Sequence, residues 1–265
     1  MREREWRSHE QEISRRKIAS WKNIEEKGEM QWVENSSLQG RWDSFELWFR
    51  SVLPPEEADI KEYIERTLSP LSSRVGIELG GTGSPLFAGF SPRFFDKTIG
   101  MNSCDTRTKL QNVYPELIAQ QLAGDEARNH HVISGSFLDP AVKGVVKDEL
   151  AGRKASLIME RMYAGIDSLP NEPFYLSQEI GFWYNEILAQ GGLLFAQVPK
   201  AFERYLPIWE SLCKAEFADR LTIQSGNYNG HTLVRIQKLT NEPLPLLPVR
   251  DVLGGEKRYH SRPLY

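Results

Sequence analysis

Short apolar runs alternate with longer amphipathic stretches between about residues 70 and 200. The apolar runs predict strands at residues 75–79, 98–102, 131–134, 155–159 and 193–198. The stretches between them predict helices near residues 85–89, 115–123, 141–150 and 176–190. Strands that alternate with helices are typical of an α/β fold, in which a mostly parallel sheet carries helices on both faces.

Two further apolar segments, residues 221–225 and 232–236, flank the dipeptide Asn229-Gly230. Asparagine followed by glycine tolerates the positive φ angles of a tight hairpin turn. The sequence therefore predicts that a terminal antiparallel β-hairpin completes the sheet.

The first 70 residues have a helical pattern. Residues 2–26 contain neither proline nor glycine, and residues 42–53 carry aromatic side chains at helical spacing; residues 56–68 predict a third helix. The aromatic side chains either pack against the following domain or form a lid over its active site. We divide the chain into an N-terminal helical extension (1–70), an α/β domain (71–240) and a Pro-rich C-terminal tail (241–265).

The 265 residues carry a formal net charge of −3, which gives no general attraction to nucleic acid. Cys104 and Cys213 are the only cysteines and lack zinc-ligand spacing, so we expect no metal site and a reducing compartment. No apolar run is long enough for a signal-peptide core or a membrane span. We expect a cytoplasmic protein without membrane association.

A glycine cluster directly follows the first predicted strand, in residues 74–85, RVGIELGGTGSP. A reversal from strand to helix needs permissive backbone angles, and a Cβ there would hold a ligand away from the exposed amides at the helix start. In open parallel sheets, ligands bind at the carboxyl ends of the strands, where the topology changes direction. The sequence therefore predicts a ligand site around residues 78–84.

This segment resembles the first motif of the class I S-adenosylmethionine-dependent methyltransferases, an acid followed by a glycine-rich turn. The resemblance implies a Rossmann-like domain, S-adenosyl-L-methionine as the cofactor, and an enzyme that transfers a methyl group. It assigns cofactor binding to the acid and the turn, with the acid ordering the turn and meeting the amino end of the ligand. These residues are Glu78, Gly80, Gly81, Thr82 and Gly83.

Two later positions are implied by the same resemblance. The family places a carboxylate on the ribose hydroxyls after the second strand, where this chain offers Asn102 and, three residues later, Asp105. Asp105 could equally begin the next loop. After the third strand, Ser136 stands where the family has an acid that meets the adenine, and Phe137 could stack on the base.

Polar residues follow the fourth predicted strand, where this family has side chains that face the methyl donor and the acceptor. Glu160, Arg161 and Tyr163 are therefore candidates for substrate contact or acid–base catalysis. A structural ion pair that joins Glu160 to Arg161 or to a neighbour is an equally good interpretation. His130 and His131 begin the third strand, at the opposite edge, and are interpreted as structural.

Two other functions stay open. One is a dinucleotide-dependent oxidoreductase, which uses NAD(P) and also has a glycine turn after its first strand. Its motif is Gly-x-Gly-x-x-Gly. In this chain the first two glycines of that motif would be Gly81 and Gly83, but Leu86 stands in the third glycine position. A non-catalytic methyltransferase-like binding module is the other, because Thr82, Asn102 and Ser136 depart from the family pattern. If the protein is a methyltransferase, we expect a small-molecule acceptor, which the sequence does not identify further, and the oligomeric state is not predicted.

Overall fold

The computed structural model describes residues 42–102, 111–112, 114–161, 165–169, 173–245 and 247. A seven-stranded sheet lies at its centre, in the order β3-β2-β1-β4-β5-β7-β6. All neighbouring strands are parallel except those that involve β7, which is antiparallel to both β5 and β6. The strands are β1 Val75–Leu79, β2 Lys97–Asn102, β3 His130–Ser134, β4 Ala155–Glu160, β5 Leu188–Val198, β6 Leu221–Tyr228 and β7 His231–Lys238.

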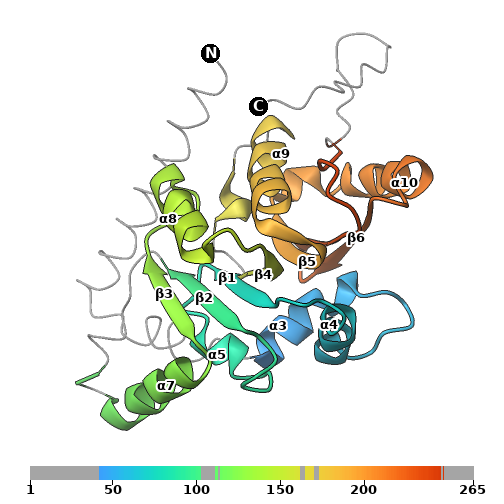
Figure 1. The fold of residues 1–265 in the computed structure, drawn as a ribbon. Coiled ribbons are helices and arrows are strands. Elements are labelled where there is room, and N and C mark those ends of the chain that lie inside the picture. The colour runs from blue at the N-terminus through green and yellow to red at the C-terminus, as the bar shows by residue number, and fades with distance from the viewer. Residues whose placement is uncertain are drawn as a thin grey trace.

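Helices cover both faces of the sheet (Figure 1). One face carries α3 (Trp42–Phe49) with the 3-10 turn η1 (Arg50–Val52), α4 (Ile60–Leu68), α5 (Ser84–Phe87) and α7 (Pro115–Ala127). The other face carries α8 (Pro140–Leu150), α9 (Pro173–Gly181), its π-helical continuation η3 (Phe182–Ile187) and α10 (Leu206–Glu216). Short 3-10 turns, η2 (Ile166–Ser168) and η4 (Lys200–Phe202), follow β4 and β5. The predicted α/β class, mostly parallel with one terminal antiparallel hairpin, is confirmed.

Each face of the sheet has its own apolar cluster, and this explains the aromatic side chains before β1. Phe45 and Phe49 of α3 both meet the ring of Phe195 on β5 edge to face, at 5.6 Å between centroids. Phe49 is 1% exposed. The described part of the N-terminal region therefore packs on the domain through these rings.

The helix expected at residues 56–68 is shorter than predicted. It begins at Ile60, because the side chain of Asp59 accepts a hydrogen bond from the Glu62 amide at 2.9 Å and caps the first turn. The acids before Asp59 suggested an earlier start, but an N-cap fixes a helix boundary more strongly than a favourable charge does.

The helix predicted for residues 176–190 was wrong at its end. The α-helix passes into η3, and β5 already begins at Leu188. Gly191 and Gly192, which directly follow the predicted helix, lie inside the strand. Gly191 has a φ of +81°, and the register between β4 and β5 shifts at this point. The glycines therefore permit a β-bulge rather than ending a helix.

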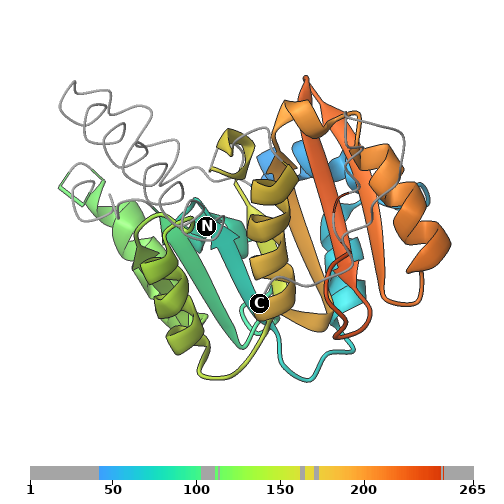
Figure 2. The ribbon, with the colours of Figure 1, turned by 90° about the horizontal axis from the view of Figure 1, so that it is seen from above.

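Of two elements in the C-terminal half, a helix and a hairpin, the sequence predicted only the hairpin. The helix α10 was missed, although Leu206, Trp209 and Cys213 are buried on one side of it. The hairpin is confirmed, since Asn229 and Gly230 have φ angles of +49° and +80°. Figure 2 shows the sheet from above, with α7 beside its β3 end and α10 beside its β6 end.

The remaining expectations concern segments that are not described. The predicted helix at residues 2–26 and the tail beyond residue 247 lie outside the described residues, so the division into three regions stays a prediction. No helix within the described ranges combines the length and the apolar character needed to cross a membrane.

Candidate functional site

The direction of the sheet changes between β1 and β4. The chain runs outward from β1 to β2 and β3, then returns to the other side of β1 as β4. The carboxyl ends of β1, β2 and β4 meet at this switch point, which is where open α/β sheets bind ligands. The candidate residues Glu78, Asn102, Glu160 and Arg161 all lie there.

Glu78 is the polar centre of this edge. It is 3% exposed, and its Oε2 accepts a hydrogen bond from the Gly83 amide at 2.6 Å. Its Oε1 accepts two more, from Arg161 Nε at 2.9 Å and Nη2 at 2.8 Å. The expectation that Glu78 orders the glycine turn therefore agrees with its contacts, and Arg161 is the cation that neutralises it.

The turn after β1 folds back over the neighbouring strand. The Gly80 amide donates to the Met101 carbonyl at 2.7 Å, and Gly81 forms an antiparallel bridge with Met101. The next residue, Thr82, lies over Gly100, where a Cβ would be only 1.9 Å from the Thr82 carbonyl oxygen. The turn crosses β2 so closely at this point that only glycine fits at position 100.

The glycines of the turn, which were expected to contact a ligand, pack instead against other parts of the protein. A Cβ on Gly81 would lie 2.2 Å from Glu78 Oε2 and 2.6 Å from Arg161 Nε, and one on Gly83 would lie 2.5 Å from the His130 ring. The Gly80 and Gly83 amides, which were expected to face a ligand, are hydrogen-bonded within the protein. A ligand at this edge would therefore contact groups beyond the turn, at the strand ends.

Asn102, at the end of β2, offers a polar side chain that a ligand at the strand ends could contact. It is 1% exposed, and its side-chain Nδ2 has no hydrogen-bond partner within the part of the chain that is described. Its backbone carbonyl accepts from the Gly135 amide at 2.7 Å, which fixes the position of the residue. A buried amide donor without a partner fits a ligand hydroxyl. The alternative ribose ligand, Asp105, lies outside the described residues.

The predicted adenine contacts are enclosed. Ser136 is 5% exposed, and its hydroxyl oxygen accepts a weak hydrogen bond from the Leu138 amide at 3.4 Å. Phe137 is 2% exposed and meets the ring of Trp183 edge to face, at 6.2 Å between centroids. The ring of Phe137 thus packs in the core, and its proposed stacking on a base stays a prediction.

Glu160 has the contacts of a structural residue. It is fully buried, its Oε1 accepts from the Ile166 amide and its Oε2 accepts from the Gln197 amide, each at 2.9 Å. The carboxylate thereby joins the segment after β4 to the end of β5. The alternative interpretation, an ion pair that joins Glu160 to Arg161, does not appear among the contacts of the described residues, where Arg161 pairs with Glu78 instead. Catalysis by Glu160 stays a prediction, and Tyr163 lies outside the described residues.

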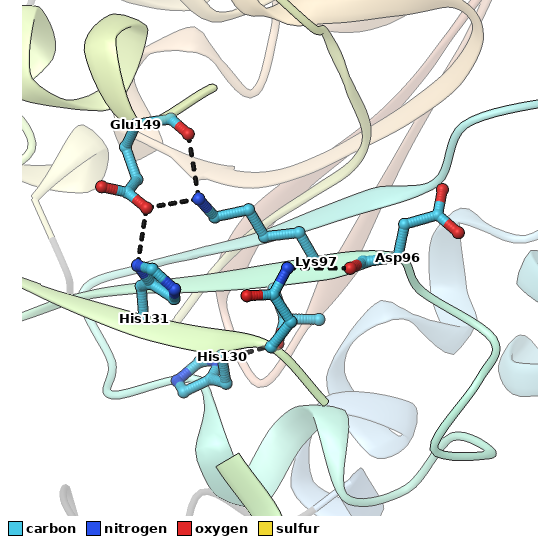
Figure 3. Close-up of polar contacts among 7 residues, drawn as sticks. Asp96, Lys97, His130, His131 and Glu149 are labelled. Atoms are coloured by element: carbon cyan, nitrogen blue, oxygen red, sulfur yellow. Dashed lines mark hydrogen bonds and ion pairs between the residues drawn. The ribbon is translucent and has the colours of Figure 1, made fainter. Parts of the chain in front are cut away.

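A second polar cluster occupies the opposite edge of the sheet (Figure 3). Lys97 donates to the carboxylate of Glu149 and, at 3.0 Å, to its carbonyl, while His131 Nδ1 lies 2.6 Å from the same carboxylate. The hydrogen bond from Lys97 lowers the pKa of Glu149. This cluster ties α8 to the starts of β2 and β3, which agrees with the structural interpretation of His131.

That edge also holds a shallow cavity of about 210 Å³ where β1, β4 and β5 begin. The cavity therefore lies at the other end of the strands from the predicted ligand site at the carboxyl ends of β1, β2 and β4. Within the described ranges, no group of histidine, cysteine and acidic side chains could hold a metal ion. The lining residues are Leu71, Ser72, Ser73, Arg153, Lys154, Ala189 and Gln190.

The sheet, with one antiparallel strand between β5 and β6, has the fold of the class I, Rossmann-like methyltransferases. No protein-family model matches the sequence, and no curated protein matches it. Solved structures align at low identity. An rRNA methylase from Streptococcus thermophilus has 12% identity and a TM-score of 0.41, over 71% of this chain and 100% of its own.

Two other alignments are similar in extent. SMU.1697c from Streptococcus mutans, solved in complex with SAH, has 15% identity and a TM-score of 0.39, over 69% of this chain and 99% of its own. The precorrin 8w decarboxylase of Methanobacterium thermoautotrophicum has 13% identity and a TM-score of 0.35, over 69% of this chain and 92% of its own. At these scores the alignments assign no residue roles and no substrate.

Proposed function

We propose that this protein binds S-adenosyl-L-methionine at the carboxyl ends of β1, β2 and β4, and that it is an enzyme that transfers the methyl group to a small-molecule acceptor. The observation that carries the proposal is the buried amide nitrogen of Asn102, which has no hydrogen-bond partner among the described residues. A donor left unpaired in a buried position costs about 1–3 kcal/mol. A ribose hydroxyl at the end of β2 would accept its hydrogen bond and remove that cost.

The cofactor supplies a methyl group on a sulfonium that is already a good leaving group. The protein then has to bind and orient the two reactants, since alignment at near-attack distance provides much of the acceleration. Asn102 would hold the ribose, and Glu78 would keep the turn closed around the amino-acid end. The segments after β4 and β5 would face the acceptor.

One observation favours a different function, a methyltransferase-like module that binds a partner without catalysis. Gly81 packs directly on Glu78 and Arg161, and the amides of Gly80 and Gly83 are occupied. These contacts would hold the turn together without any ligand. The two proposals differ in a measurable property, the affinity for the cofactor and its demethylated product.

Calorimetric titration of the full-length protein with S-adenosylmethionine, S-adenosylhomocysteine and NAD(H) tests the proposal. We expect binding of the first two ligands only. Asn102→Leu should weaken their binding at least tenfold while the free energy of unfolding stays equal or rises, because the change removes a buried unpaired group.

Thr232→Val is the matched control, since the Thr232 hydroxyl is also buried without a partner in the described chain but lies on β7. It should leave the affinity unchanged. A folded protein that binds neither adenosyl ligand would favour the non-catalytic module, and one that binds only NAD(H) would favour the oxidoreductase.

A further inference from the structure

We infer that Arg161 is the residue that binds the carboxylate of the cofactor's amino-acid end, and that Glu78 is a positioning residue that holds the Arg161 guanidinium in place. This inference rests on the proposed function and deepens it. It differs from the role that the resemblance implied for Glu78, which was to meet the amino end of the ligand directly.

The first argument is the number of hydrogen bonds that Glu78 already accepts. A carboxylate offers about four lone-pair positions. Three are used, by the Gly83 amide at 2.6 Å and by Arg161 Nε and Nη2 at 2.9 and 2.8 Å. Because the carboxylate is this fully engaged within the protein, it has little capacity left for a ligand ammonium.

The second argument is which member of the pair reaches solvent. The Arg161 side chain is 18% exposed, whereas that of Glu78 is 5% exposed. The guanidinium is therefore the more accessible member of the pair. The amino-acid end of S-adenosylmethionine carries a carboxylate, and a guanidinium binds carboxylates in a planar, charge-assisted geometry.

The third argument is that Arg161 is held at both ends. Its backbone amide donates to the Leu79 carbonyl at 2.8 Å, which extends the pairing of β4 with β1. Its guanidinium is fixed by Glu78 and packs against Gly81, where any larger residue would displace it. A side chain fixed before the ligand arrives loses little conformational entropy on binding. The tight position at Gly81 is thus explained by the packing of the Glu78 carboxylate and the Arg161 guanidinium against it.

The test compares two ligands that differ only in the carboxylate, S-adenosylmethionine and decarboxylated S-adenosylmethionine, by titration calorimetry on the full chain. The wild-type protein should prefer S-adenosylmethionine by about tenfold to a hundredfold, the range expected for charge-assisted hydrogen bonds. In Arg161→Gln this preference should fall to less than about threefold, mainly through weaker binding of S-adenosylmethionine. Arg161→Lys should keep part of it, because lysine retains the charge and loses the planar geometry.

Glu78→Gln tests the positioning role, since the guanidinium would lose its anionic anchor. The preference should fall to an intermediate ratio. Arg153→Gln is the matched control, because Arg153 is an exposed arginine at the opposite edge of the sheet, and its ratio should equal that of the wild type. Circular dichroism and urea unfolding establish that each variant is folded.

Three results would overturn the inference, and they separate it from the proposed function. Equal affinity of the wild type for both ligands would remove the role of Arg161 and leave cofactor binding standing. Tighter binding of both ligands by Arg161→Gln would show that Arg161 competes with the ligand for Glu78. Absence of binding of either ligand by the folded wild type would overturn the proposed function and this inference together.

Discussion

His130 and Thr82, far apart in the sequence, meet where the glycine turn lies over β2. His130 Nε2 is 2.6 Å from the Thr82 carbonyl oxygen, and its Nδ1 is 2.7 Å from the Thr98 hydroxyl. A carbonyl oxygen only accepts, so Nε2 carries the proton, and in the neutral ring Nδ1 accepts from Thr98. The imidazole therefore links the turn to the starts of β2 and β3.

This link predicts the effect of His130→Ala. The change removes a hydrogen bond to a fully buried residue, so the free energy of unfolding should fall by about 1–3 kcal/mol. Affinity for S-adenosylhomocysteine should fall as well, because the turn loses its anchor. Urea unfolding and calorimetry measure the two effects. His131→Ala is the control, with an expected loss of less than about 1 kcal/mol, since its contact with the Glu149 carboxylate is partly exposed.

Two glycine-to-alanine changes should change the free energy of unfolding in opposite directions. In Gly100→Ala the new Cβ would lie 1.9 Å from the Thr82 carbonyl oxygen, so the turn must shift, at a cost of about 2–3 kcal/mol. Gly144 lies within the helix α8 with nothing within 4 Å of a new Cβ, so Gly144→Ala should stabilise by about 0.5–1 kcal/mol. The midpoints of denaturant unfolding measure both effects. A Gly100→Ala variant as stable as the wild type would contradict the close approach of the turn to β2.

Glu160→Gln separates a structural role from a catalytic one. Glutamine keeps one acceptor but turns an NH₂ group toward a second backbone amide, so one buried N–H group loses its partner. We expect a loss of about 2 kcal/mol in the free energy of unfolding, with cofactor affinity unchanged. Unchanged stability together with loss of methyl transfer would instead support acid–base chemistry at Glu160.

Cys213 gives a pH-dependent prediction. The thiol is 1% exposed, and burial raises its pKa from 9.0 to about 12. Between these values the folded protein keeps a proton that the unfolded chain releases, so this group makes stability fall as the pH rises above about 9. The difference in unfolding free energy between the wild type and Cys213→Ala, measured from pH 8 to pH 11, isolates the effect. A difference that is independent of pH would contradict the burial of the thiol.

The same burial should slow chemical modification of Cys213. In a Cys104→Ser background, a disulfide reagent at pH 8 should react with the folded protein orders of magnitude more slowly than with the unfolded chain, because the thiolate is the reactive form.

Most of the sheet could be predicted because its strands are short apolar runs bounded by turn residues. β1 matches its predicted bounds, and β2, β3 and β4 differ by one residue at one end. β5 could not be delimited, since Gly191 and Gly192 are compatible with both a helix C-cap and a bulge, and only pairing with β4 decides between them. Local sequence does not contain that tertiary choice.

The site was predicted less completely than the fold. Glu78 and the turn lie at the end of β1, where the sequence put them, and their role in cofactor binding stays a prediction. The partner of Glu78 is Arg161, directly after β4, and no local sequence pattern pairs these two residues. The crossing of the turn over Gly100 was missed for the same reason. A glycine within β2 was the available signal, since glycine inside a strand often marks a close backbone approach.

The position of β7 between β5 and β6 has a consequence for biosynthesis. β6 pairs with no described strand except β7, and β5 needs β7 to cover its open edge. During translation, the edge of β5 and the whole of β6 therefore wait unpaired until residue 238 has left the ribosome. A nascent chain interrupted before that point leaves β5 and β6 without their common partner, and unpaired strand edges of this kind favour aggregation.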